Sequence, residues 1–237
     1  RADTLKVRAF ARSFGRIAKT DAIDARTLAR YGQDRWRELA LFVPGREPLD
    51  LLTSLVARRH DLVALKVAEE NRAKAPGPDE VRRSCRTILA AILSQLDLIN
   101  AQIDDLIDRC PDLRRRIAVS QSLPGVGPRT AILLAATMPE LGTMTRRQAA
   151  SLAGLAPHPN DSGTIRGYRR MRGGRGNVRA ALFMAALAAS RANGPLRLTY
   201  QRLVENGKKP IVAIAALMRK IIVILNARIR DDLAKQS

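Results

Sequence analysis

The stretch from Asp79 to Cys110, DEVRRSCRTILAAILSQLDLINAQIDDLIDRC, decides the fold of the central part of the chain. Its apolar residues recur at steps that alternate between four and three, which is the heptad pattern of a helix that packs along one seam. The seam consists of Cys85, Leu89, Ile92, Leu96, Ile99, Ile103, Leu106 and Cys110. This pattern predicts one long helix, which packs either on a neighbouring helix of the same chain or on a second subunit.

A second helical arm is predicted just upstream of this stretch. It extends from about Pro48 to Ala73, and Pro76-Gly77-Pro78 breaks it before Asp79 caps the next helix. Pro111 ends the long helix. Residues 47–112 are therefore expected to form a helical hairpin or coiled-coil linker. A seam this regular also favours a homo-oligomer, a dimer or a tetramer, although the sequence does not show which surface makes it.

The rest of the chain also has a helical pattern. Thr20 or Asp21 can cap a helix that extends to about Tyr31, with Gly32 just beyond its end. Further helices are predicted over residues 129–137, 146–152 and 177–191, and after Pro195 and Pro210. The expected fold is mainly α, in three parts: residues 1–46, the hairpin at 47–112, and a C-terminal domain at 113–237.

Charge and composition restrict the function classes. Lys and Arg total 42 against 22 Asp and Glu, and the formal net charge of +20 indicates a polyanionic partner such as DNA or RNA. Two cysteines and two histidines provide neither a disulfide framework nor a zinc site. The apolar run from Ile211 to Leu225 contains Arg219 and Lys220, so no membrane partner is expected. With no signal peptide visible, the expected location is the cytoplasm.

The turn Leu123-Pro124-Gly125-Val126-Gly127-Pro128 lies between two predicted helices and looks like a helix-hairpin-helix element. Gly125 and Gly127 allow tight, positive-φ backbone, so that the amides at the start of the next helix can point at a phosphate. Arg129 would add positive charge there. Such contacts bind the backbone of a nucleic acid without reading its bases. The alternative is a plain turn between two helices.

A second candidate binding element is the loop from Ser162 to Asn177, SGTIRGYRRMRGGRGN. It holds five arginines, five glycines and no acidic residue, and partial alternation around Gly167 predicts a short β-hairpin. The arginines are Arg166, Arg169, Arg170, Arg172 and Arg175. A guanidinium group fits phosphate oxygens and stabilises charge that develops at phosphorus. Ser162 can be a nucleophile if a base or a metal activates it, or simply a turn residue.

Asp21 and Asp24 form the candidate metal site. They lie one helical turn apart, so both carboxylates face the same way and can supply two ligands of a Mg²⁺ ion. The alternative is that both are acids of a helix N-terminus, where they interact favourably with the helix dipole.

Several blocks of sequence occur in an order that resembles the IS110 family of insertion-sequence transposases, to which the pilin-gene invertases are related. The blocks are KTDAIDA from Lys19, LPGVGPRTA from Leu123, LAGLAP from Leu152, DSG from Asp161, GGR from Gly173 and LMRKIIVILN from Leu217. The resemblance covers nearly the whole chain, and it is specific because several independent blocks agree.

The resemblance implies a RuvC-like (ribonuclease H-fold) domain with four acidic residues, followed by a transposase domain with a serine. Asp21 and Asp24 match the last two acids, and Ser162 matches the serine. The first two acids and most of the RuvC-like sheet would lie upstream of Arg1. Residues 1–46 are therefore expected to be the C-terminal remnant of that domain, and the fragment alone is expected to be inactive.

By resemblance, the complete enzyme uses Mg²⁺ at the acidic cluster and Ser162 to attack a DNA phosphate, forming a transient phosphoserine link. A guide RNA encoded by the element is a further implied partner. The residues themselves leave two alternatives. One is a helical nucleic-acid-binding module without chemistry. The other is a tyrosine recombinase using Tyr168 or Tyr200, a chemistry that wants several Arg, His or Lys groups around the tyrosine, whereas the chain has two histidines.

Overall fold

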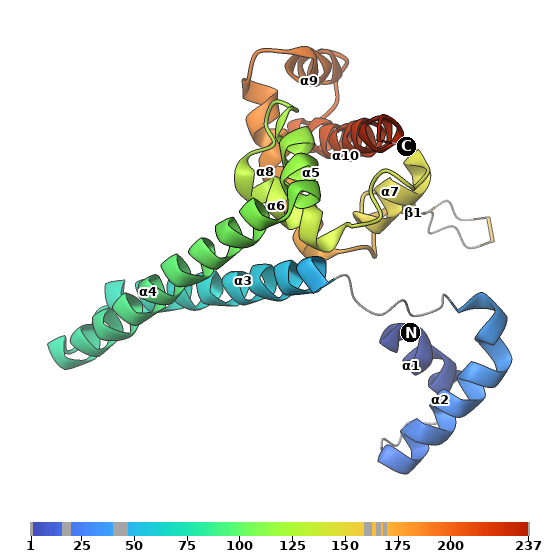
Figure 1. Ribbon diagram of the computed structural model, residues 1–237, viewed down its shortest axis with the longest axis horizontal. Coiled ribbons are helices and arrows are strands. Elements are labelled where there is room, and N and C mark those ends of the chain that lie inside the picture. Colours follow the sequence, from blue (N-terminus) through green and yellow to red (C-terminus); the bar gives the residue numbers. More distant parts are fainter. Residues whose placement is uncertain are drawn as a thin grey trace. The chain divides into compact units, whose positions relative to one another are not determined.

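The computed structural model describes residues 2–15, 20–39, 47–158, 163–164, 167 and 170–236. Its described part is mainly helical, as the sequence predicts (Figure 1). The chain divides into two compact units, residues 1–46 and 47–237. Each unit is built on its own internal contacts.

The N-terminal unit consists of α1 (Thr4–Ser13), α2 (Asp21–Arg35) and the short 3₁₀ helix η1 (Trp36–Glu38). Thr20 caps α2 by accepting a hydrogen bond from the Ile23 amide at 3.3 Å, as predicted. The predicted end at Tyr31 is wrong, because the helix continues through Gly32 to Arg35. A glycine inside a helix costs only about 1 kcal/mol, which the packing of buried Tyr31 against α1 offsets.

A long helical hairpin opens the second unit (Figure 1). Its arms are α3 (Glu47–Lys74) and α4 (Asp79–Arg109), close to the predicted boundaries. The α4 seam packs on α3 of the same chain, where Leu62 meets Ile92 and Leu96 in one apolar cluster. The heptad pattern therefore serves a contact within the chain. The expected cap differs: Asp79 is the first residue of α4, and Pro78 before it makes no side-chain cap.

The remaining helices gather at one end of the hairpin (Figure 1). They are α5 (Pro111–Gln121), α6 (Pro128–Thr137), α7 (Arg146–Leu152), α8 (Gly176–Arg191), α9 (Pro195–Glu205) and α10 (Pro210–Ala234). Prolines open α5, α6, α9 and α10, because the first helical residue needs no amide donor. The hairpin residues Leu52, Val56 and Ile103 belong to the same core as these helices, so the hairpin is joined to them by apolar packing.

The last helix, α10, lies at the centre of this core. Among the described residues it is the one helix long and apolar enough to span a membrane by length and composition. Here its apolar face is packed on α5, α7, α8 and α9. Leu217, Ile221 and Ile222 have no exposed surface, and burial of each such side chain stabilises the fold by about 1.5–3 kcal/mol. The apolar character of α10 is therefore explained by its place in the core.

Candidate functional site

The loop that carries Ser162 is closed at its base by two short paired strands. Strand β1 (Pro157–His158) pairs antiparallel with β2 (Arg170–Met171), and Pro157 lies opposite Met171. The prediction of a short β-hairpin within residues 162–177 is met only in part: the second strand lies in that range, but the first strand precedes it, and residues 159–169 lie between the two. Ser162, Arg166 and Arg169 lie outside the described residues, and Arg170 is described by its backbone. We call residues 159–169 the serine loop, and the two chain segments below it, 152–158 and 170–175, the stem.

Two glycines bring the segments of the stem into backbone contact. Gly154 follows α7 and Gly174 precedes α8, and both have positive φ, +70° and +66°. A β-carbon on Gly174 would lie 2.2 Å from the Gly154 nitrogen, so only glycine fits this approach. The Arg175 amide then donates to the Leu152 carbonyl at 2.9 Å. The LAGLAP and GGR blocks of the sequence are thus the two facing segments of one stem.

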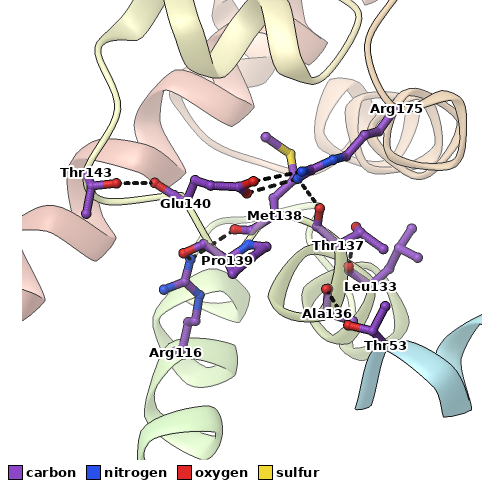
Figure 2. Close-up of polar contacts among 10 residues, drawn as sticks. All are labelled: Thr53, Arg116, Leu133, Ala136, Thr137, Met138, Pro139, Glu140, Thr143 and Arg175. Atoms are coloured by element: carbon purple, nitrogen blue, oxygen red, sulfur yellow. Dashed lines mark hydrogen bonds and ion pairs between the residues drawn. The ribbon is translucent and has the colours of Figure 1, made fainter. Parts of the chain in front are cut away.

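Arg175 also ties the stem to the loop that joins α6 and α7 (Figure 2). Its two terminal nitrogens donate to the two carboxylate oxygens of Glu140 at 2.9 and 2.7 Å, and one of them also donates to the Thr137 carbonyl. This fork-to-fork geometry is the strongest form of an ion pair between these groups. The structure thus places the predicted phosphate ligand Arg175 in a contact with protein.

The pKa of Glu140 reflects this contact. Partial burial raises the pKa of the carboxyl group, but hydrogen bonds from Arg175 and the backbone, with the charges of Arg175 and Arg116, outweigh it. The pKa therefore lies below its ordinary value of 4.5, and Glu140 is ionised at neutral pH.

The loop between α6 and α7 is itself held in place by Arg116 of α5 (Figure 2). One terminal nitrogen of Arg116 donates to the carbonyls of Met138, Pro139 and Leu141, at 3.0, 2.9 and 3.0 Å. These carbonyls follow the end of α6, where no helical partner is available to them. Arg116 therefore acts as a cap for this chain reversal.

Asn226 of α10 holds the other end of the same loop. Its side-chain oxygen accepts from the Gly142 amide at 2.9 Å, and its amide nitrogen donates to the Met144 carbonyl at 2.7 Å. Asn226 is 2% exposed, so the two hydrogen bonds satisfy both polar atoms of a buried side chain. Glu140 consequently belongs to a segment that is fixed to the core on both sides.

The turn between α5 and α6 holds the other predicted phosphate ligands. Gly125 has φ +93°, and a β-carbon there would lie 2.6 Å from the Ala185 carbonyl of α8, so this glycine faces the core. Gly127 differs from the expectation of positive φ: at −78° it has an ordinary extended backbone and forms the N-cap of α6. Pro128 occupies the first helical position, where it has no amide to offer. Arg129 is exposed beside it.

A groove of about 790 Å³ opens at the start of α6, between α3, α4 and α8. The polar side chains that line it are Arg59, His60, Asn100, Asp104, Arg129 and Thr130. Arg59 donates to the Asn100 side chain at 2.8 Å. Sequence reasoning missed Arg59 and His60, because they come from the hairpin and reach this turn only through the tertiary fold. Arg172, on the other predicted binding element, is exposed.

Asp21 and Asp24 lie in the first turn of α2, Asp21 exposed and Asp24 half-buried. Over the described part of the chain, no group of three or more His, Cys, Asp or Glu side chains is placed to hold a metal ion. Two carboxylates one turn apart match part of the oxygen set that Mg²⁺ requires and leave further ligands to be supplied.

Comparison with known proteins finds two family models that match parts of the chain. Residues 118–201 match the model described as Transposase IS116/IS110/IS902 family, and residues 2–75 match a second model described as Transposase, of the IS110 DEDD type. The first match contains the α5–α6 turn and the serine loop, and the second contains Asp21 and Asp24. The two matches thus cover both candidate sites with transposase sequence.

Individual relatives extend the match to almost the whole chain. The chain is 31% identical to the pilin gene-inverting protein of Moraxella bovis over 239 residues, covering 96% of this chain and 71% of that protein. It is 36% identical to the insertion element IS110 uncharacterized 43.6 kDa protein of Streptomyces coelicolor, covering 69% of this chain and 40% of that protein. The chain belongs to the IS116/IS110/IS902 family of transposases.

Proposed function

We propose that this chain carries the serine nucleophile of a DNA recombinase, which cuts and rejoins DNA at the ends of a mobile element. The observation that best supports the proposal is the stem. Gly154, Gly174 and the β1–β2 pairing close the base of a loop that contains one DSG serine and several arginines. A loop closed in this way can present a hydroxyl group and guanidinium groups together, which acyl- and phosphoryl-transfer sites require.

In the proposed reaction, the hydroxyl oxygen of Ser162 attacks a DNA phosphorus atom. A bond from the serine oxygen to phosphorus forms, the bond from phosphorus to one deoxyribose oxygen breaks, and the released sugar oxygen takes up a proton to replace the one that the serine hydroxyl loses. A hydroxyl of another strand then attacks the phosphoserine and restores the serine. Because each step exchanges one phosphate ester for another, no external energy source is needed. Arg166, Arg169 and Arg170 would neutralise charge on the phosphate oxygens.

Asp21 and Asp24 are proposed as two ligands of Mg²⁺, which would lower the pKa of a bound hydroxyl group and neutralise phosphate charge. The donor set fits a hard, oxygen-preferring cation, and the first two acids of the family would complete it. The net charge of +20 supports DNA as substrate and a guide RNA as partner, in the cytoplasm. A homo-oligomer remains part of the proposal. Its contacts would use surfaces other than the α4 seam, which is covered by α3.

A second candidate function is a nucleic-acid-binding module without chemistry of its own. The observation that favours it is the place of Asp21 and Asp24 in the first turn of α2, where carboxylates interact favourably with the helix dipole without any metal ion. The tyrosine alternative is less favoured at Tyr200, because Tyr200 is half-buried against the main core through α9. Tyr168 lies outside the described residues.

The decisive experiment traps the covalent intermediate. The protein extended upstream to include the first two family acids is incubated with DNA, guide RNA and Mg²⁺, and the linked residue is identified by mass spectrometry. Ser162→Ala should abolish the adduct while DNA affinity persists, because the hydroxyl contributes little to binding. Ser151→Ala, at an exposed serine of α7, is the matched control and should retain the adduct.

The adduct should also be labile to alkali, because phosphoserine can eliminate and phosphotyrosine cannot. An alkali-stable link, or normal recombination by Ser162→Ala, excludes the serine mechanism. The present chain without its upstream extension should bind nucleic acid and form no adduct. Strand exchange by the chain alone would show that the four-acid cluster is not required.

A further inference from the structure

Arg175 stands at the junction between the stem and the core. It is the N-cap residue of α8 and directly follows the glycine that closes the stem. Its backbone amide holds the end of α7 through Leu152, and its side chain holds the loop between α6 and α7 through Glu140. One residue therefore closes the stem through its backbone and joins the stem to the loop between α6 and α7 through its side chain; Figure 2 shows the side-chain contact.

The partner of Arg175 is well fixed. Glu140 lies between Pro139, whose carbonyl is held by Arg116, and Gly142, whose amide is held by the buried Asn226. A carboxylate on a segment held on both sides can set the orientation of a planar guanidinium, because two parallel hydrogen bonds allow little rotation. The Arg175 side chain is 34% exposed and the Glu140 side chain is 41% exposed, so water partly screens the pair. The pair therefore adds little to the free energy of unfolding, and its main effect is to fix the orientation of the Arg175 side chain.

We propose that Glu140 and Arg175 are a positioning pair, which sets the stem on the core so that the serine loop meets the scissile phosphate in a productive orientation. This inference rests on the proposed serine mechanism. In this proposal the Arg175 side chain binds Glu140 and does not contact phosphate. The arginines closer to Ser162 in the sequence, Arg166, Arg169 and Arg170, contact the phosphate. Glu140, which no sequence block singled out, becomes part of the reaction machinery by acting through Arg175.

The competing role for Arg175 is direct phosphate binding. The two roles predict different effects on DNA affinity when the charge of Glu140 is removed. If Arg175 binds phosphate, removing the Glu140 charge frees the guanidinium and strengthens DNA binding. If the pair positions the stem, removing that charge leaves DNA affinity almost unchanged and slows the chemical step. A displacement of about 1 Å in a reacting group can cost up to about 100-fold in rate.

The test compares Glu140→Gln and Arg175→Lys in the upstream-extended enzyme with its DNA and guide RNA. Glu140→Gln keeps the shape of the side chain and removes its negative charge. Arg175→Lys keeps the positive charge and removes the planar guanidinium that forms two parallel hydrogen bonds. Glu70→Gln is the matched control, because Glu70 pairs with Lys66 on α3 at 3.5 Å and does not touch the stem. Three quantities are measured: the rate of Ser162 adduct formation at saturating DNA, the DNA dissociation constant, and amide hydrogen exchange in residues 170–175.

Both site variants should slow adduct formation by about 10- to 100-fold while changing the dissociation constant by less than about 2-fold. Hydrogen exchange of the Arg175 amide, which donates a hydrogen bond to the Leu152 carbonyl, should become faster in both variants. Glu70→Gln should change none of the three. Tighter DNA binding by Glu140→Gln, or an unchanged adduct rate in both site variants, overturns the positioning role.

Failure of the serine mechanism and failure of the positioning pair give different experimental results. If the wild-type enzyme forms no adduct on Ser162, the proposed function fails. Amide hydrogen exchange in residues 170–175 then tests the role of the pair by itself. Faster exchange in Glu140→Gln supports the role of the pair in holding the stem, and unchanged exchange overturns that role.

Discussion

Gly174 lies against Gly154 so closely that a β-carbon on Gly174 would be 2.2 Å from the Gly154 nitrogen. Gly174→Ala should therefore force the two segments of the stem apart. Gly173→Ala is a matched control, because Gly173 also has positive φ, +70°, but faces open space. The control should cost only the backbone strain of about 1–2 kcal/mol. We expect Gly174→Ala to lose recombination and to be cleaved faster by trypsin at the arginines of the serine loop. Equal recombination and equal cleavage rates in the two variants would contradict the close contact.

The α4 seam gives a second prediction. Leu96 is 8% exposed and packs on α3, whereas Leu98 on the same helix is 50% exposed. Leu96→Glu buries an unpaired charge and should lower the free energy of unfolding by about 3 kcal/mol or more, measured by urea denaturation. Leu98→Glu should change it by less than about 0.5 kcal/mol. Conversion of an oligomer to well-folded monomers by Leu96→Glu, seen by light scattering, would show that the seam is a subunit interface.

The third prediction concerns nucleic-acid binding. If six phosphates are neutralised, a log–log plot of affinity against salt concentration should have a slope of roughly −5 on duplex DNA. Replacing Arg169 and Arg170 with alanine should weaken binding to all sequences alike, because phosphate contacts carry no base information. Arg109→Ala serves as control, since Arg109 pairs with Asp105 on α4. A slope near zero removes the electrostatic case for a nucleic-acid partner.

The fourth prediction is a pH dependence that belongs to Glu140. Its folded-state pKa is depressed below 4.5. The pair therefore contributes stability that is fully present above about the unfolded pKa and is lost as the pH falls through the folded pKa. Because the pair is partly exposed, the contribution should stay below about 1 kcal/mol. Wild type and Glu140→Gln, compared by urea unfolding from neutral to acidic pH, should converge in stability as the pH falls. A constant difference would show that the charge of Glu140 is not involved.

Sequence reasoning located the helices well, and its errors have local explanations. The bounds of α7 and the starts of α9 and α10 follow from prolines, caps and glycines that act within a few residues. The predicted end of α2 at Tyr31 is wrong because buried Tyr31 packs on α1, and the helix propensity of Gly32 takes no account of that contact. Gly125 and Gly127 looked equivalent, yet Gly125 alone has positive φ, because it approaches α8.

What the sequence by itself determined is the helical class, the order of the elements, the basic charge and the family blocks. All of these depend on spacing and composition along the chain. The tertiary structure decided which surfaces meet. Only the fold shows that the seam packs on α3, that Gly154 meets Gly174 and that Arg175 reaches Glu140, which lies 35 residues away. A heptad pattern indicates that an apolar face is covered, and an arginine side chain indicates that an anion lies near it. The sequence does not identify either partner, because packing and ion pairing depend on distances that arise only when the chain has folded.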